Sequence, residues 1–365
     1  MTSTQTPYAS LPDTAFWRRA VASIQAADVD PVGDVPFALT KTDRIATAGS
    51  CFAVHLSRHL ANSGFNYFVT EPVHPFLGPV AADFNYGAFS ARYGNIYTSR
   101  QLVQLFDRAY GAFNPAEDIW RNEDGRCFDP FRPNIQPNGF ASEREYWEDR
   151  QRHLAAVRQL FEQLDVMVFT MGLTEGWLSR EDGAAFTLCP GVAAGTFDAE
   201  RHQFHNLTCQ EVIADLETFI LKLRQVNPKA RVILTVSPVP IIATMEPRHV
   251  LVSNAYTKCA LRAACDAVLS RFSDVAYFPG YEIVTSNYTR GRYFADDLRS
   301  VTPEGVDLVM NLFYQHYGAG AGQEASAVEE RQSAANAYEE RTRLSQQVND
   351  VLCDEEMLDS EAASI

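Results

Sequence analysis

The sequence lacks the features of a membrane, secreted or nucleic-acid-binding protein. No window approaches the roughly 18 consecutive apolar residues of a membrane-spanning helix, and residues 1–19 lack the basic, apolar and small-residue order of a signal peptide. Positive charge is also scarce, because 31 Lys and Arg residues stand against 46 Asp and Glu residues, a net charge of -15. Nucleic acids and anionic membranes need a basic counter-surface. We therefore expect a cytoplasmic protein with no nucleic-acid or membrane partner.

Paired cysteines are also missing. The seven cysteines are an odd number, scattered along the chain without a C-x-x-C pair, which argues against a disulfide framework or a zinc ribbon. Most are expected to be small buried apolar residues. Cys51 differs because it lies in a short glycine-containing turn. A redox role for Cys51 is less favoured, since no second cysteine is close in the sequence.

The chain is apolar enough to form a large core. Its 365 residues are 46% hydrophobic and 12% aromatic, which excludes global disorder. We divide it into an N-terminal extension (1–40), an α/β domain (41–317) and a C-terminal tail (318–365). Between Glu324 and Glu361 there are 11 acidic residues against 3 arginines. This tail is expected to be an acidic helix or a disordered appendage, and a possible contact for a protein partner.

Strands and helices alternate along the central domain. A short β-capable run at 44–48 leads into a tight turn and then a helical pattern with Phe52, Leu56 and Leu60 near one face. Later buried strands are predicted at 166–171, 231–236 and 275–278, and helices at about 145–163, 208–225, 254–271 and 303–317. This alternation predicts a three-layer α/β/α sandwich built on a parallel sheet.

A long insertion separates the first helix from the second strand. This segment, about 65–142, is rich in aromatics, Pro, Gly and Asn, and a helix is predicted within it near 98–108. The segment is too long for an ordinary loop. We expect it to cover the carboxyl edge of the sheet, where insertions often roof an active site.

Ligands of open parallel sheets bind beyond the carboxyl ends of the strands, so the residues that follow each strand are candidates for the site. They are Gly49-Ser50-Cys51, Gly172-Leu173-Thr174-Glu175, Ser237-Pro238-Val239-Pro240 and the stretch through Asp296, Asp297 and Ser300. A nucleophile on a strand-to-helix turn gains from the positive helix end, which lowers a thiol pKa and holds a developing oxyanion. Ser50 and Cys51 have this setting, which equally suits a structural N-cap.

One of these turns carries a family resemblance. Ala48-Gly-Ser-Cys-Phe-Ala53 resembles the motif that names the GSCFA family. Further segments similar to that family are Tyr93-Gly-Asn-Ile-Tyr-Thr98, Phe169-Thr-Met-Gly-Leu-Thr-Glu-Gly-Trp177, Thr235-Val-Ser-Pro-Val-Pro240 and Tyr277-Phe-Pro-Gly-Tyr-Glu282. The family is grouped with the SGNH, or GDSL-like, hydrolases. The resemblance therefore implies a flavodoxin-like α/β/α fold and hydrolysis or transfer of acyl groups, with a small-molecule or glycan acyl ester as substrate.

The resemblance also suggests a nucleophile and oxyanion donors. SGNH enzymes carry Gly-Asp-Ser with a serine nucleophile, and aligning the glycines places Cys51 at that serine. A shift of one residue makes Ser50 the nucleophile instead. Cys51 is slightly preferred, because a thiolate needs less help from a base. Gly172 and Thr174 occupy the place of the SGNH Gly-x-Asn, so a backbone N–H and a hydroxyl are expected to hold the oxyanion. Glu175, the next residue, is grouped with them as a substrate-binding residue.

The catalytic base is where the sequence departs from the SGNH pattern. The Asp-x-x-His motif is matched by Asp297-Leu-Arg-Ser300, with serine in place of the imidazole. Serine cannot act as a general base near neutral pH. His249 is expected to replace it, with Asp297 orienting the base and with Glu175 or His74 as alternatives. The competing hypothesis is a non-catalytic binding or assembly protein on a degenerate SGNH scaffold.

Two histidine pairs have spacings that could suit metal ligands. His55 and His59 have the i, i+4 spacing of a helical zinc site, but the intervening residues include no glutamate and no third ligand is evident. His202 and His205 are expected in a polar loop, without a ligand at suitable spacing. We expect neither a metal site nor a cofactor.

Overall fold

A four-stranded parallel sheet forms the centre of the computed structural model, which describes residues 6–74, 76, 80–318 and 357–358. Its strands are β1 (Ile45–Gly49), β4 (Val166–Met171), β8 (Arg231–Val236) and β9 (Val275–Tyr277), in the order β1-β4-β8-β9. All three strand pairs are parallel. The strands predicted from the apolar runs are confirmed, with ends shifted by no more than one residue.

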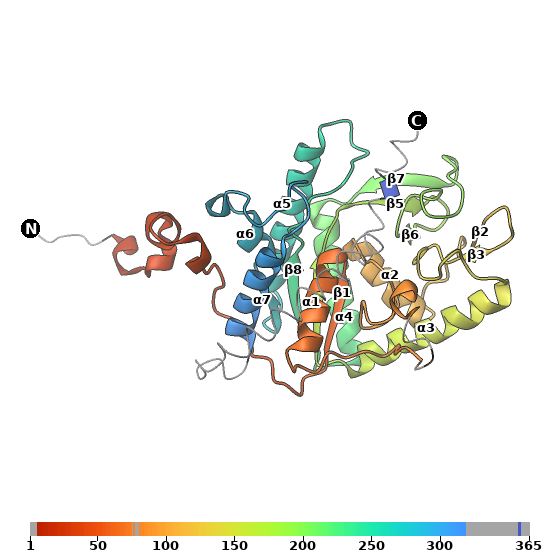
Figure 1. Ribbon diagram of the computed structural model, residues 1–365, viewed down its shortest axis with the longest axis horizontal. Helices are drawn as coiled ribbons and strands as arrows, with labels where there is room; N and C mark the ends of the chain where they lie inside the picture. The colour runs from red at the N-terminus through yellow and green to blue at the C-terminus, as the bar shows by residue number, and fades with distance from the viewer. Residues whose placement is uncertain (1–5, 75, 77–79, 319–356, 359–365) are drawn as a thin grey trace, which may run out of the picture.

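Helices connect these strands in the expected way (Figure 1). They are α1 (Cys51–Asn62), α2 (Ser99–Ala109), α3 (Glu143–Gln163), α4 (Cys209–Val226), α5 (Val250–Leu269), α6 (Gly280–Thr285) and α7 (Pro303–Tyr317). The six longer helices match the predicted ones, although α5 begins before its predicted start. The short helix α6 was not predicted.

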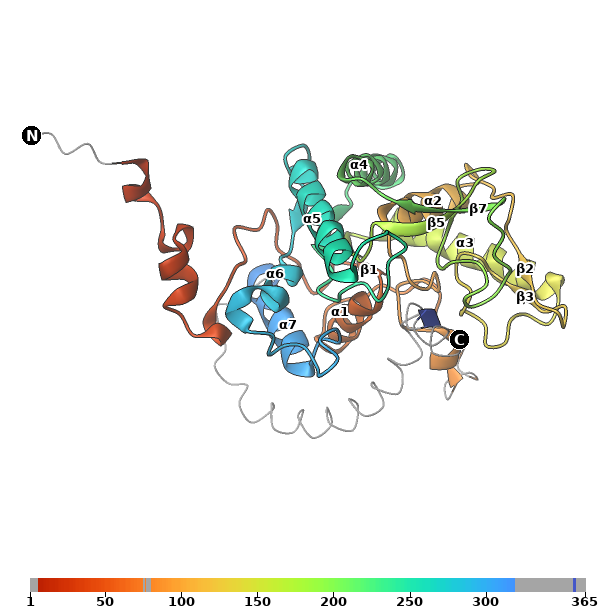
Figure 2. The same cartoon turned by 90° about the horizontal axis from the view of Figure 1, so that it is seen from above.

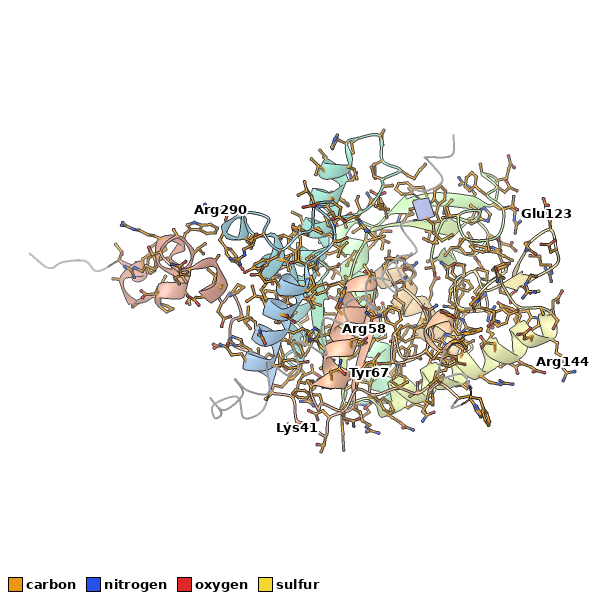
Figure 3. All side chains as sticks on the ribbon, viewed as in Figure 1. Lys41, Arg58, Tyr67, Glu123, Arg144 and Arg290 are labelled. Atoms are coloured by element: carbon orange, nitrogen blue, oxygen red, sulfur yellow. The ribbon has the colours of Figure 1, made fainter. Side chains whose placement is uncertain are left out.

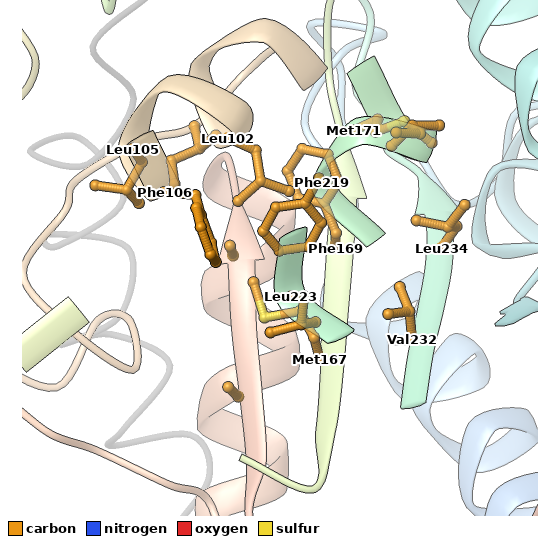
Figure 4. Close-up of a cluster of buried hydrophobic side chains, with 14 of the residues drawn as sticks. Leu102, Leu105, Phe106, Met167, Phe169, Met171, Phe219, Leu223, Val232 and Leu234 are labelled. Carbon is orange, nitrogen blue, oxygen red and sulfur yellow. The ribbon is translucent and has the colours of Figure 1, made fainter. Parts of the chain in front are cut away.

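The helices cover both faces of the sheet. On β4 the side chains alternate, so that Met167 and Phe169 pack in one apolar cluster and Val166 and Val168 in another. The first cluster includes side chains of α2, α3, α4 and α5, and Figure 4 shows its part between β4, β8 and the neighbouring helices. The second includes side chains of α1, α6 and α7, which lie on the opposite side of the sheet in Figure 2. The predicted three-layer sandwich is therefore confirmed.

A backbone stretch beside β1 completes the topology. Tyr67 forms a parallel bridge with Ile45, supported by hydrogen bonds from the Ile45 N–H to the Asn66 carbonyl (3.0 Å) and from the Phe68 N–H to the Ile45 carbonyl (2.9 Å). The spatial order is thus residues 66–68, β1, β4, β8 and β9, which is the flavodoxin-like order. Because the chain first goes to one side of β1 and then to the other, the topological switch point lies between β1 and β4. Ligands of such sheets bind at this point.

Two smaller antiparallel sheets extend the molecule beyond the sandwich. They contain β2 (Trp120–Arg121) with β3 (Cys127–Phe128), and β5 (Glu175–Ser179) between β6 (Ala185–Phe186) and β7 (His202–Asn206). The expectation of a polar loop around His202 and His205 was wrong, because both belong to β7. In Figure 3, Glu123 and Arg144 mark the end of the molecule that these elements extend, opposite the N-terminal segment.

The terminal segments contribute little to this core. Residues 7–28 form short helical turns without buried side chains, set apart from the sandwich in Figures 1 and 2. The predicted acidic tail lies outside the described residues, except for residues 318, 357 and 358. Within the described ranges no helix has both the length and the apolar character needed to cross a bilayer.

Candidate functional site

The turn between β1 and α1 is pressed against the end of β4. Gly49 has a φ of +148°, and a Cβ atom there would lie 2.5 Å from the Thr170 carbonyl oxygen and 2.8 Å from its Cβ. Both the backbone angle and the close approach require glycine. Gly49 thereby places Ser50 and Cys51 at the switch point of the sheet.

Ser50 is the N-cap residue of α1, and its hydroxyl lies against Gly172. In this fully described turn the hydroxyl accepts no hydrogen bond from the first N–H groups of the helix. A Cβ atom built on Gly172 would lie 3.3 Å from Ser50 Oγ. The Ser50 side chain is 4% exposed, whereas Cys51, the first residue of α1, is partly exposed. The Ser50 hydroxyl therefore does not cap α1 and is instead directed towards Gly172 at the end of β4.

The start of α1 supplies a positive electrostatic potential. The Ser50 carbonyl accepts the Ala53 N–H at 2.8 Å, so the helix begins directly at the turn. No acidic residue occupies the first turn of α1, which is described throughout. The helix dipole at the start of α1 can therefore act on a nearby anion without local neutralisation.

The insertion reaches this edge of the sheet through the segment 93–98. The Ile96 N–H donates to the Gly49 carbonyl at 2.8 Å, and the Tyr97 carbonyl accepts the N–H groups of Gly172 and Leu173, both at 3.0 Å. These bonds attach one segment to the ends of both β1 and β4. The insertion therefore lies at the carboxyl edge, as expected from the sequence.

The groups predicted to hold an oxyanion are already engaged. The N–H of Gly172 donates to Tyr97, as described above, and Thr174 is fully buried with its Oγ1 2.9 Å from Thr257 Oγ1. To stabilise a reaction intermediate, either group would have to exchange its present partner. Their role as oxyanion donors stays a prediction.

His249 and His74, both predicted as possible bases, are exposed and make local contacts. His249 is the N-cap residue of α5, and its Nδ1 accepts the Leu251 N–H at 3.1 Å. His74 Nδ1 accepts the Phe76 N–H at 3.4 Å, and the two rings stack with centroids 5.2 Å apart. In each ring, Nδ1 therefore accepts a hydrogen bond from a backbone N–H.

Glu175, the other alternative base, ties β5 to the loop that follows β8. Its carboxylate accepts the Thr244 hydroxyl at 2.7 Å and the Met245 N–H at 3.2 Å. Burial raises the pKa of Glu175, although both hydrogen bonds oppose this shift. The structure therefore shows Glu175 as an anchor of the loop that leads to α5.

Asp297 and Ser300 are bonded to each other. The Asp297 carboxylate accepts the Ser300 hydroxyl at 2.5 Å and the N–H groups of Ser300 and Arg299, each at 2.9 Å. Burial acts to raise the pKa of Asp297, but these hydrogen bonds outweigh it and the pKa is lowered. Arg299 Nε donates to the Pro240 carbonyl at 3.2 Å, which holds the loop near the end of β8. The segment that matches Asp-x-x-His thus reaches the region beyond β8.

Three of the four histidines spaced like metal ligands, His59, His202 and His205, lie beside carboxylates of other elements. His59 Nε2 is 3.8 Å from Asp307, and burial followed by the charges of Arg58 and His59 lowers the pKa of His55 to about 4. On β7, His202 Nε2 lies 3.0 Å from Glu117 and His205 Nε2 lies 2.7 Å from Glu211. Among the described residues no group of three or more His, Cys, Asp and Glu side chains is arranged to hold a metal ion.

A buried lysine, which the sequence analysis did not single out, lies beside Gly172. Lys258 on α5 is 1% exposed, and its Nζ donates to the Gly172 carbonyl at 3.0 Å. The sequence contained a signal, because residues 258, 261 and 265 follow the i, i+3, i+7 spacing of one helix face. Leu261 and Cys265 are fully buried, so this face of α5 packs inward.

Two small hollows lie near the turn. One is bordered by Tyr93, Asn95 and Ile96, and the other by Thr98, Thr174 and Trp177. Of the residues described here, neither Ser50 nor Cys51 lines either hollow. The hollows are therefore neighbours of the candidate site, on the side of the insertion and β5.

The model of the GSCFA family matches residues 44–313, from the residue before β1 to the last helix of the sandwich. The match includes the turn at Ser50, the end of β4 and Lys258. No curated protein matches the chain.

Proposed function

The chain belongs to the GSCFA family, and on that premise we propose that it is an acyl-ester hydrolase or O-acyltransferase. Its substrate would be a small-molecule or glycan acyl ester, with a covalent acyl-enzyme formed on Ser50 or Cys51. The observation that carries the proposal is the placement of these two residues. They start a helix at the switch point of a flavodoxin-like sheet, with the Ser50 hydroxyl against Gly172.

At this position Ser50 or Cys51 would react by acyl transfer. The nucleophile gives its proton to a base as its oxygen or sulfur bonds to the acyl carbon, and the carbonyl oxygen becomes an oxyanion. The positive end of the α1 dipole would stabilise that charge. The proton then goes to the departing alcohol, and water or a second alcohol releases the acyl group from the enzyme.

The sequence-derived base is His249, with Asp297 as the group that orients it. His249 Nδ1 accepts a backbone N–H, so in the neutral ring Nε2 carries the hydrogen and Nδ1 is the nitrogen that would take a proton. The Asp297 oxygens are bonded within their own loop. The proposal for His249 therefore needs Nδ1 to give up the Leu251 N–H and to reach the turn at Ser50.

A second candidate function is a non-catalytic binding or assembly protein. The closed contact between Ser300 and Asp297 favours it, because the residues at the Asp-x-x-His positions bond each other at 2.5 Å. The acidic tail would then be a contact for a protein partner. The tail lies almost entirely outside the described residues, so this partner is proposed from charge alone.

Covalent probes separate the two functions. A fluorophosphonate reports a reactive serine and iodoacetamide a reactive cysteine. Among the six described cysteines Cys259 is the exposed one, and Cys259→Ser would remove its reaction, which is independent of function. We expect one stoichiometric adduct, on residue 50 or 51, and loss of ester turnover in Ser50→Ala or Cys51→Ala with nearly unchanged Tm. Full activity in both variants would contradict the enzyme proposal. The absence of any adduct in the folded protein would support the binding protein.

A further inference from the structure

Lys258 is unusual among the lysines of the chain. There are four, at positions 41, 222, 229 and 258, within a total of 31 Lys and Arg residues. Lys41 and Lys229 are exposed, and Lys222 forms an ion pair with Asp107. Lys258 is 1% exposed. Burial disfavours the charged form of an amine, so a fully buried lysine is costly to stability and suggests a specific role.

The surroundings of Lys258 connect it with the candidate site. The first half of α5 buries Ser253, Thr257 and Lys258, whereas its second half buries apolar side chains. Thr257 contacts Thr174 and Lys258 contacts Gly172, so the polar half lies at the end of β4. This is the strand end against which the β1–α1 turn is pressed.

Gly172 lies beside both Lys258 and Ser50. Its carbonyl oxygen accepts the Lys258 amine at 3.0 Å, and the position of its missing Cβ is 3.3 Å from Ser50 Oγ. The amine and the hydroxyl therefore border the same glycine. A side chain at position 172 would add bulk next to the hydroxyl.

We propose that Lys258 is the proton acceptor for Ser50, an inference that rests on the proposed acyl-transfer function. The neutral amine takes the Ser50 hydroxyl proton as Oγ bonds to the acyl carbon, and becomes an ammonium. The ammonium returns that proton to the departing alkoxide, which leaves as an alcohol, so atoms and charge balance. Lys258 thus fills the role that Ser300 cannot perform. Arginine could donate to the Gly172 carbonyl as well, but it does not deprotonate in proteins.

The test compares Lys258→Arg and Lys258→Ala with Lys229→Ala, an exposed-lysine control, in fluorophosphonate labelling of Ser50. We expect Lys258→Arg to remain folded by circular dichroism and to label at least about 100-fold more slowly, the usual contribution of a general base. In Lys258→Ala, small primary alkylamines should restore labelling in proportion to their concentration and with a dependence on amine pKa. A merely structural lysine would show no such dependence. Lys229→Ala should label at the wild-type rate.

The outcomes distinguish this inference from the function on which it rests. Wild-type protein that takes no adduct on residue 50 or 51 contradicts the proposed function, and the base assignment with it. Wild-type protein that is labelled at Ser50, together with a Lys258→Arg variant of equal rate and pH profile, overturns only the role of Lys258. An adduct confined to Cys51 and independent of Lys258 overturns it too. A large rate loss in His249→Gln with no loss in Lys258→Arg would assign the base to His249.

Discussion

The Ser50 hydroxyl faces Gly172 across the ends of β1 and β4, and a methyl group on Gly172 would be 3.3 Å from Ser50 Oγ. Gly172→Ala should therefore displace the hydroxyl by a few tenths of an ångström. We expect ester turnover and Ser50 labelling to fall at least about tenfold, since small misplacements of reacting groups are costly. Tm should change little, because this contact is tight without being a severe overlap.

Gly176→Ala is the matched control for this change. Gly176 lies four residues further along, on β5, where an added Cβ would meet only Thr98 Cγ2 at 4.0 Å. That variant should keep the wild-type labelling rate. Equal labelling rates in Gly172→Ala and wild-type protein would show that the Ser50 hydroxyl position does not matter for reactivity.

Gly49→Ala tests the turn itself. At Gly49 a methyl group would combine a positive φ with a 2.5 Å overlap on the Thr170 carbonyl oxygen. Gly64, just after α1, has a φ of +76° with nothing within 4 Å of an added Cβ. We expect Gly64→Ala to cost about 1 kcal/mol of unfolding free energy and Gly49→Ala about 3 kcal/mol or more, measured by chemical denaturation. Equal losses would mean that the close approach to β4 contributes nothing to stability.

The parallel sheet could be predicted from the sequence because each of its strands is a local apolar run. Segments 166–171 and 231–236 are buried on both faces, so their strand character needs no knowledge of their neighbours. The small sheet of β5, β6 and β7 gave no comparable signal. Its pairs, such as Trp177 with Phe204, join half-polar segments whose register depends on tertiary contacts.

The candidate site could be predicted only in part, for a similar reason. Ser50, Cys51 and Gly172 directly follow strands, so the rule for parallel sheets located them. Lys258 reaches Gly172 from 86 residues away, in the middle of a helix. The helical spacing of residues 258, 261 and 265 indicates only that this residue faces inward, and not that it lies beside Gly172. The helix-capping contact of His249 could not be predicted from the sequence either, because it depends on the residue at which α5 begins.

Thr235→Val should stabilise the protein. Thr235 on β8 is 2% exposed, and in the described part of the structure its Oγ1 has no hydrogen-bond partner. Valine has nearly the same shape and removes a buried unpaired hydroxyl, so we expect a gain of about 1 kcal/mol in unfolding free energy. In the control, Thr187→Val, the lost hydroxyl donates to the Phe131 carbonyl at 2.7 Å, and stability should fall by about 1 kcal/mol. Similar losses in both variants would show that the Thr235 hydroxyl is satisfied in solution.

Acid should destabilise the first helix of the sandwich through His55, which lies one turn after Cys51 on α1. Burial, the charge of Arg58 and the charge of His59 lower the pKa of His55 from 6.5 to about 4 in the folded protein. Unfolding therefore takes up a proton between these values. The stabilising effect of the neutral ring is complete above pH 6.5 and is lost as the pH falls towards 4, with a magnitude on the order of 2 kcal/mol.

His55→Gln isolates this contribution, because glutamine does not titrate while the other histidines are kept. Burial also lowers the pKa of His59, so wild-type protein and variant should both lose stability in acid, with a smaller loss in the variant. Thermal unfolding measured from pH 7 to pH 4 gives the two slopes. Since His55 and the candidate nucleophiles share α1, labelling of residue 50 or 51 should fall in parallel with stability at low pH if the helix loosens. Identical slopes would mean that His55 has the same proton affinity in the folded and unfolded chain, and that burial on α1 does not govern its titration.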